Sequence, residues 1–203
     1  MTTRPIVFIG DSITDAGRRQ DPQQLGGGYV RLVADRLAAR GDPRPIVNMG
    51  TSGNRVDDLR ERWERDVLDR QPGTLSVYVG INDTWRRYKT NEPTSAEHFE
   101  TVYRSMLEEA RALWQPRIVL VEPFVVPVSE AQERWGPEDL DEKREVVASL
   151  ATEFAAAFVP LHTIMTIAAK GEGAASLAAD GVHPTPEGNE LIAETWLAAE
   201  GSI

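Results

Sequence analysis

Five short apolar runs, separated by stretches of helical periodicity, constrain the fold of this 203-residue chain more than any other feature. They lie at residues 5–10, 45–50, 75–80, 117–122 and 157–161. Each is too short for a helix and is rich in β-branched or aromatic side chains, which is typical of strands buried on both faces of a parallel sheet. The last run is the weakest, because Pro160 cannot donate a sheet hydrogen bond and fits best in an edge strand.

Apolar residues recur at helical spacing between these runs. This periodicity predicts helices over residues 29–40, 56–67, 95–114, 140–154, 164–170 and from Pro186 onward. Alternating strands and helices predict an α/β fold, a flavodoxin-like three-layer α/β/α sandwich with about five parallel strands in a single domain over residues 1–203. We expect a polar loop over 81–94 and an irregular, proline-rich insertion over 123–137 that forms a lid or a pocket wall.

The charge and composition of the chain narrow its range of partners. Its formal net charge of −10 argues against nucleic acid and anionic membranes as main partners, because both would repel the chain at long range, and favours a neutral or cationic partner. No apolar run approaches the roughly 20 residues that span a bilayer, and the first residues lack a signal-peptide pattern, so we expect a cytoplasmic protein. The chain contains no cysteine, so its chemistry must depend on oxygen and nitrogen groups.

A Gly10-Asp11-Ser12 turn ends the first predicted strand. Open α/β sheets bind their ligands at the carboxyl ends of the strands, so this turn would present the Ser12 hydroxyl at the mouth of an active site. Ser12 is therefore a candidate nucleophile. The alternative is that Ser12 only caps the following helix, since serine and aspartate are both favoured cap residues.

Polar turns also follow the second and third predicted strands. Gly53 and Asn54 come after the second strand, and Asn82 and Asp83 come after the third. Because the carboxyl ends of parallel strands share one edge of the sheet, we expect these turns to converge with Ser12.

The chain has three histidines that could act as a base toward Ser12. We expect His98 to be solvated on a helix surface and His162 to be structural. His183 precedes the last helix, and Asp180 stands three residues before it. That spacing lets the carboxylate turn back onto the imidazole and fix its tautomer, as deprotonation of a serine requires. A pair of metal ligands would show the same spacing.

Four blocks of the sequence, in this order along the chain, resemble those of the SGNH hydrolases, also called GDSL esterases and lipases. They are Gly10-Asp11-Ser12-Ile13, the segment 48–54 that contains Gly53, Gly80-Ile81-Asn82-Asp83, and Asp180-Gly181-Val182-His183-Pro184. The blocks extend from the first strand to the last helix, and four ordered blocks are a specific signal. Ile13 stands where the family often has leucine, a change that should affect only packing.

The resemblance implies a role for each of these polar residues. Ser12 is expected to be the nucleophile, His183 the general base, and Asp180 the group that orients His183. The backbone N–H groups of Ser12 and Gly53, with the side-chain amide of Asn82, are expected to form the oxyanion hole. No metal and no other cofactor is implied, and the resemblance allows a homo-oligomer.

Longer stretches are similar to bacterial carbohydrate esterases of this family that remove acetyl groups from xylo-oligosaccharides. These stretches are 26–30, 53–56 and 80–86. The similarity predicts hydrolysis of short-chain acetyl esters on small carbohydrates through an acyl-enzyme. Asp11, Trp85 and Tyr88 are candidate substrate contacts, since aromatic faces can stack on sugar rings.

Other functions remain open from the residues alone. One is a broad short-chain esterase, lipase or thioesterase of the same family. Another class is a metal-dependent phosphoesterase, whose ligands would be Asp11, Asp15, Asn82, Asp180 and His183. A receiver-like signalling module shares the architecture, but it needs a phosphoacceptor aspartate where this chain has Gly80.

Overall fold

The computed structural model describes residues 3–201, which form a five-stranded sheet with parallel pairing throughout. The strands are β1 (Ile6–Gly10), β2 (Ile46–Gly50), β3 (Thr74–Tyr78), β4 (Arg117–Val121) and β5 (Ala157–Val159). Their order across the sheet is β2-β1-β3-β4-β5, which confirms the predicted edge position of the last strand. All five apolar runs therefore form strands.

This strand order places a topological switch point beside β1. The chain crosses from β1 to β2 on one side and then returns past β1 to β3 on the other. In sheets with this flavodoxin-like order, the crevice at the carboxyl ends of β1 and β3 is the usual place for a ligand. Ser12 follows β1 and Asn82 follows β3, so both residues lie beside that crevice.

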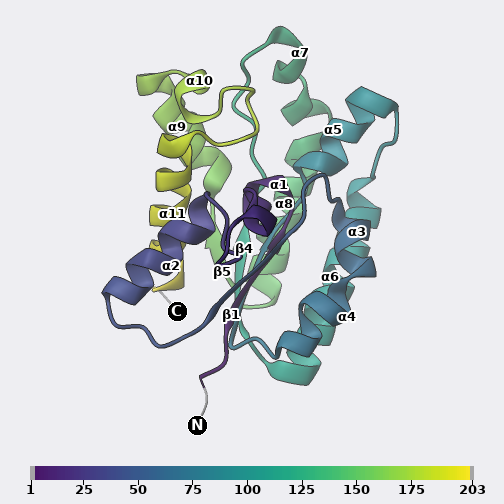
Figure 1. The fold of residues 1–203 in the computed structure, drawn as a ribbon. Coiled ribbons are helices and arrows are strands. Elements are labelled where there is room, and N and C mark those ends of the chain that lie inside the picture. Colours follow the sequence, from purple (N-terminus) through teal and green to yellow (C-terminus); the bar gives the residue numbers. More distant parts are fainter. Residues whose placement is uncertain (1–2, 202–203) are drawn as a thin grey trace.

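Helices cover both faces of the sheet, as the predicted three-layer sandwich requires (Figure 1). One face packs against α2 (Tyr29–Ala39), α9 (Leu161–Glu172) and α11 (Pro186–Glu200), and the other against α3 (Val56–Glu61), α4 (Trp63–Asp66), α6 (Ala96–Trp114) and α8 (Asp141–Glu153). Alternation along β1 separates the two cores. Phe8 packs with Trp196 on the first face, whereas Val7 belongs to the core around Trp63 on the second.

Shorter elements complete the described chain. They are α1 (Ser12–Asp15), α5 (Ile81–Thr90), α7 (Glu130–Glu133), α10 (Ala174–Leu177), the 3₁₀ turns Arg18–Gln20 and Leu68–Arg70, and a π-helical turn at Gly136–Leu140. The predicted loop over 81–94 was wrong for most of its length, because α5 begins three residues after β3. Within residues 3–201, no helix is both long enough and apolar enough to cross a bilayer.

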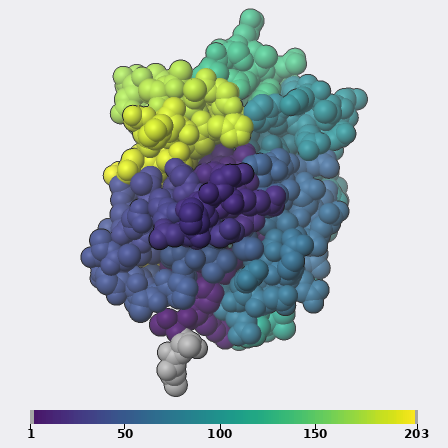
Figure 2. Space-filling view, in the orientation of Figure 1, coloured from purple at the N-terminus to yellow at the C-terminus, as the bar shows by residue number. Residues whose placement is uncertain are grey.

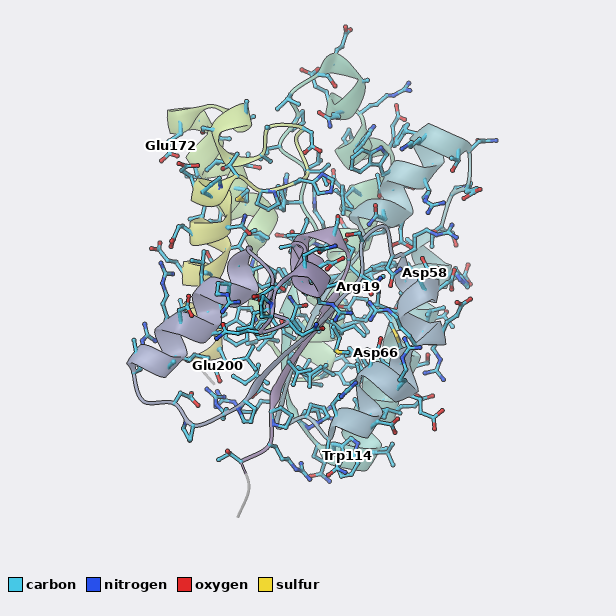
Figure 3. The ribbon with its side chains drawn as sticks, in the orientation of Figure 1. Arg19, Asp58, Asp66, Trp114, Glu172 and Glu200 are labelled. Atoms are coloured by element: carbon cyan, nitrogen blue, oxygen red, sulfur yellow. The ribbon has the colours of Figure 1, made fainter. Side chains whose placement is uncertain are left out.

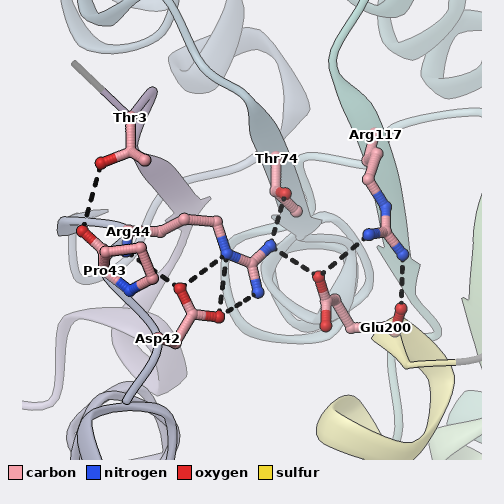
Figure 4. Close-up of polar contacts among 7 residues, drawn as sticks. All are labelled: Thr3, Asp42, Pro43, Arg44, Thr74, Arg117 and Glu200. Carbon is pink, nitrogen blue, oxygen red and sulfur yellow. Dashed lines mark hydrogen bonds and ion pairs between the residues drawn. The ribbon is translucent and has the colours of Figure 1, made fainter. Parts of the chain in front are cut away.

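An ion-pair network closes the opposite, amino-terminal edge of the sheet (Figure 4). The Arg44 guanidinium donates hydrogen bonds to Asp42 and, at 2.7 Å, to the buried carboxylate of Glu200. Arg117 donates to the backbone carbonyl of Glu200, also at 2.7 Å. This network holds the last turn of α11 against the edge of the sheet that is remote from Ser12. It therefore stabilises the fold and takes no part in the region around Ser12.

Candidate active site

In the turn after β1, the hydroxyl of Ser12 is not used to cap the following helix. The carboxylate of Asp11 accepts the Ile13 N–H at 3.0 Å, so Asp11 and not Ser12 caps the short helix α1. Gly10 is required by crowding, since a Cβ there would lie 2.4 Å from both Thr14 Oγ1 and the Tyr78 carbonyl oxygen. The capping alternative for Ser12 is therefore wrong.

The structure brings Ser12 and His183 together although they are 171 residues apart in sequence. Ser12 Oγ lies 2.9 Å from His183 Nε2, and His183 Nδ1 lies 2.6 Å from Asp180 Oδ2. In the space-filling view the purple N-terminal segment borders the yellow C-terminal segment on one face (Figure 2). With Nδ1–H donating to Asp180, Nε2 is left to accept the serine proton, which is the order that general-base catalysis needs.

The carboxylate of Asp180 is held by several donors at once. Its Oδ1 accepts the N–H groups of Val182 at 2.9 Å and of His183 at 2.7 Å. Partial burial alone would raise the pKa of Asp180, but the hydrogen bonds from the His183 side chain and these two backbone groups outweigh it and hold the pKa below its usual value. Asp180 therefore stays ionised and keeps the imidazole oriented.

The proline-rich insertion supports the loop that carries His183. Gln132 Nε2 donates to the Asp180 carbonyl at 2.7 Å, and the Val126 N–H donates to the Gly181 carbonyl at 3.0 Å. Gly181 has a φ of +83°, and a Cβ there would approach Gln132 within 2.8 Å. The insertion thus lies behind the catalytic loop and braces it, instead of covering the site as a lid.

Three hydrogen-bond donors face the same region as Ser12 Oγ. Among residues 3–201, neither the Ser12 N–H nor the Gly53 N–H finds an acceptor, and both residues line the pocket at the sheet edge. Gly53 has a φ of +81° and open space where a Cβ would stand, so backbone conformation rather than crowding requires glycine. Asn82 Nδ2 donates to the Asn54 carbonyl at 3.1 Å, which leaves its second N–H free to bind an oxyanion.

These groups open into a pocket of about 490 Å³. Its walls are formed by Ser12, Ser52, Gly53, Asn82, Trp85, Arg86, Lys89, Thr90 and His183. The nucleophile, the base and all three donor residues are therefore on its surface, while Asp180 lies behind His183. A cavity of this size is at the lower end of those that bind small molecules.

Asp11 cannot contact substrate, which corrects the sequence-based prediction. Its side chain is 0 % exposed beneath the turn, and its Oδ2 has no hydrogen-bond partner among the described residues. Burial raises the pKa of Asp11 to about 7, well above the ordinary 3.8. The residue before the nucleophile is therefore a buried helix cap.

The aromatic candidates differ in their positions. Trp85 lines the pocket, with its ring centroid 5.8 Å from that of His183. Tyr88 does not line the pocket; its ring stacks on the buried Trp135, and its hydroxyl donates to Glu138. Both Trp85 and Tyr88 lie on α5 rather than in a loop. The ring of Trp135 packs against that of Trp85, with 5.6 Å between the ring centroids. Tyr88 as a substrate contact stays a prediction that the lining of this pocket does not support.

Arg62 is a buried residue that the sequence analysis missed. It is 8 % exposed and donates to the carbonyl oxygens of Gly10 at 2.9 Å and Met49 at 2.6 Å, to Asn54 Oδ1 at 2.7 Å and to Asp66 at 2.9 Å. Figure 3 labels Asp66 on α4. Arg62 thus ties the end of β1 to the end of β2 and to the turn that holds Gly53.

Asp83 links the other two turns of the site. Both of its oxygens lie 3.3 Å from the Val56 N–H, which joins the start of α3 to the first turn of α5. The side chain is fully buried, and burial raises its pKa to about 7. Asp83 therefore holds the two segments that carry Gly53 and Asn82 at a fixed separation.

The residues proposed for metal binding do not assemble a ligand set. Asp15 Oδ2 accepts from the backbone and side chain of Ser52, and its Oδ1 accepts the Arg18 N–H. Asp11 is buried under the turn, and Asp180 is engaged by His183. In the part of the chain that the structure describes, no three histidine, aspartate or glutamate residues are grouped so that they could hold a metal ion.

Comparison with known proteins identifies the family. The model of the GDSL-like lipase/acylhydrolase family matches residues 8–191, which include both Ser12 and His183. The chain belongs to this family. Members of the GDSL-like lipase/acylhydrolase family are carboxylic ester hydrolases, and this chain is one as well.

Relatives of this GDSL-like acylhydrolase share nearly its whole length. An acetylxylan esterase of Geobacillus stearothermophilus is 34% identical, with 97% of this chain and 93% of that protein aligned. An isoamyl acetate-hydrolyzing esterase 1 homolog of Bos taurus is 26% identical, with 98% of this chain and 82% of that protein aligned. These relatives are named for acetyl ester hydrolysis on different alcohols.

Solved structures of GDSL-like acylhydrolases superpose closely on this one. A protein of Parabacteroides merdae described as a GDSL-like lipase gives a TM-score of 0.91 at 35% identity, covering 99% of this chain and 97% of that one. The acetylxylan esterase Axe2 of Geobacillus stearothermophilus gives a TM-score of 0.88 at 33% identity, again covering 99% of this chain and 97% of that one. Three further Axe2 structures are described as catalytic mutants, in which a serine, an aspartate or a histidine is replaced by alanine.

Proposed function

We propose that this protein is a serine esterase that removes acetyl groups from small carbohydrates through an acyl-enzyme. The observation that carries the proposal is the unbroken chain of hydrogen-bonding atoms from Ser12 Oγ through His183 to Asp180, at 2.9 and 2.6 Å. Ser12 and His183 line a pocket that is also bordered by Gly53, and the N–H groups of Ser12 and Gly53 have no acceptor among the described residues. Nucleophile, base and donors to an oxyanion thus surround one point, which is the requirement of acyl transfer.

The reaction would proceed in two displacements. Ser12 Oγ attacks the ester carbonyl carbon while His183 Nε2 takes the serine proton, and the carbonyl oxygen becomes an oxyanion between Ser12 N–H, Gly53 N–H and Asn82 Nδ2. Collapse of this intermediate breaks the bond to the alcohol oxygen, which receives the proton from His183 and leaves. A water molecule, deprotonated by His183, then attacks the acetyl-serine; the bond to Ser12 Oγ breaks, Ser12 Oγ takes the proton back from His183, and acetate leaves. Removing one oxyanion donor of this kind costs on the order of 10²–10³ in rate.

Similarity to acetylxylan esterase supports acetylated xylo-oligosaccharides as substrates. The pocket offers one aromatic face, that of Trp85, beside His183. A sugar ring that stacks on Trp85 would hold an acetylated hydroxyl close to Ser12 Oγ. The pocket volume of about 490 Å³ favours a short acyl chain when a sugar occupies the same space.

A panel of esters tests this proposal. We expect fast hydrolysis of acetylated xylo-oligosaccharides and of p-nitrophenyl acetate, and slow hydrolysis of p-nitrophenyl esters with eight or more carbons. Ser12→Ala should abolish turnover and leave the circular dichroism spectrum and the unfolding temperature near those of the wild type, because the partly buried hydroxyl contributes little to packing. Equal or better activity on long-chain esters would overturn the acetylesterase assignment, and activity that survives in Ser12→Ala would overturn the serine mechanism.

A further inference from the structure

One face of α5 runs from the oxyanion position to the mouth of the pocket. Asn82, Trp85, Arg86 and Lys89 follow helical spacing, and all four line the pocket. Lys89 is seven positions after Asn82, which is about 10 Å along the helix axis at 1.5 Å per residue. The opposite face of the helix is anchored, since Thr84 donates to the buried Asp139 at 2.6 Å. The outer part of this pocket is therefore a fixed surface and not a loop.

The charge on that surface is positive, although the chain as a whole is acidic. Two of the residues that line the pocket, Arg86 and Lys89, are cationic, and none carries a carboxylate. The Arg86 side chain is 41% exposed, and among residues 3–201 it forms an ion pair with Glu92 alone, at a long N–O distance of 3.5 Å. Within residues 3–201, Lys89 forms no ion pair, whereas the neighbouring Arg87 is engaged by Asp139 at 3.0 Å. Lys89 thus points a full charge at solvent beside a catalytic pocket.

We propose that Lys89 and Arg86 bind an anionic group, a carboxylate or a phosphate, on the alcohol half of the ester. This inference rests on the proposed esterase function, because it concerns the same pocket. An acetyl group held at Ser12 is too short to reach a charge about 10 Å farther along α5, so the anion belongs to the sugar portion of the substrate. A guanidinium beside an ammonium suits either anion, since arginine can bind both in a bidentate manner.

The net charge of −10 does not oppose this binding. At physiological ionic strength, charges more than about 8 Å away are largely screened, so a small ligand in the pocket responds to the nearby cations and not to the distant carboxylates. The repulsion of nucleic acid and membranes expected from the sequence concerns partners large enough to meet the whole surface. A small anionic sugar meets only the mouth of the pocket.

Three matched substrates test the inference: an O-acetylated xylobiose, the same disaccharide bearing a terminal uronic acid, and the same disaccharide bearing a phosphate. For the wild type we expect kcat/KM for an anionic substrate to exceed that for the neutral one by about two- to fivefold, which is the effect of an exposed ion pair. The larger of the two ratios identifies carboxylate or phosphate as the preferred anion. Added salt should bring the ratio toward one.

Charge variants locate the effect. Lys89→Gln should remove most of the preference, and Glu92→Gln, which frees Arg86, should increase it. Lys170→Gln is the control, because Lys170 is an exposed lysine on α9 outside the pocket and its loss changes the net charge equally. A wild-type ratio of one, or an equal loss in Lys89→Gln and Lys170→Gln, would overturn the inference. If the neutral ester is not cleaved either, it is the esterase function that fails.

Discussion

Replacing Arg62 by methionine should destabilise the protein and misplace its catalytic turns together. Arg62 is the buried guanidinium whose four acceptors lie at 2.6–2.9 Å on the ends of β1 and β2, on Asn54 and on Asp66. Methionine fills similar space but removes the guanidinium donor from the Gly10 and Met49 carbonyl oxygens and from Asp66, so that Gly10 keeps only the Thr51 N–H and Asp66 only Arg65. Losing one partner of a buried ion pair costs about 3–5 kcal/mol.

That cost should be visible as a lower unfolding temperature. For a domain of this size, 1 kcal/mol corresponds to about 2–4 °C, so Arg62→Met should unfold roughly 6–20 °C below the wild type. Misplacing Ser12 and Gly53 by a fraction of an ångström should also lower kcat by about tenfold to a hundredfold, with a smaller change in KM. The assays are thermal unfolding followed by circular dichroism, and hydrolysis of p-nitrophenyl acetate well below the transition.

The neighbouring arginine provides a matched control. Arg65 donates to the same Asp66 at 2.7 Å, but its side chain is 71% exposed. An exposed ion pair contributes at most about 1 kcal/mol, so Arg65→Met should lower the unfolding temperature by a few degrees and leave kcat unchanged. Similar losses of stability in the two variants, or an unchanged kcat in folded Arg62→Met, would refute the positioning role of Arg62.

Three further predictions follow from the same geometry. Burial raises the pKa of Asp11 from 3.8 to about 7, so the stability that its protonated form contributes is complete below the unfolded pKa and is lost as the pH rises through 7. The free energy of unfolding of Asp11→Asn should therefore rise by about 2 kcal/mol relative to that of the wild type between pH 5 and pH 8. A difference between the two proteins in urea unfolding that does not change with pH would contradict this. Gly53→Ala forces alanine to a φ of +81°, so it should cost about 1–2 kcal/mol in thermal unfolding and, by shifting the N–H that faces the pocket, also lower kcat/KM for p-nitrophenyl acetate; an unfolding temperature equal to that of the wild type would contradict the backbone strain. Trp85→Ala should raise KM about two- to tenfold for acetylated xylo-oligosaccharides and less for p-nitrophenyl acetate, and equal changes would argue against sugar stacking.

The sequence predicts the catalytic edge of this fold well for a physical reason. Strands buried on both faces must be nearly continuous apolar runs, and the polar residue that follows each run marks a strand end. Gly10 and Gly181 are needed because other backbone or side-chain atoms already occupy the Cβ positions, so local sequence reflects tertiary crowding at both turns. The turns at the ends of the strands could therefore be placed without coordinates.

Residues whose role arises only from packing could not be predicted. Arg62 follows an amphipathic helix and resembles any exposed arginine until β1 and β2 supply its acceptors. The helix α5 is rich in charged residues, and its aromatic residues Trp85 and Tyr88 gain a partner only when Trp135 folds against them. The spacing of Asn82, Trp85 and Lys89 was the signal that could have revealed this helix.

The most direct test is to identify the residue that reacts as the nucleophile. Wild type, Ser12→Ala and His183→Ala should be treated with a fluorophosphonate and with excess chelator, and the modified peptide identified by mass spectrometry. The geometry predicts one adduct on the peptide that contains Ser12, none in Ser12→Ala, and labelling slowed by orders of magnitude in His183→Ala, with no effect of the chelator. An adduct on another residue that abolishes activity, or full hydrolysis without Ser12, would contradict it.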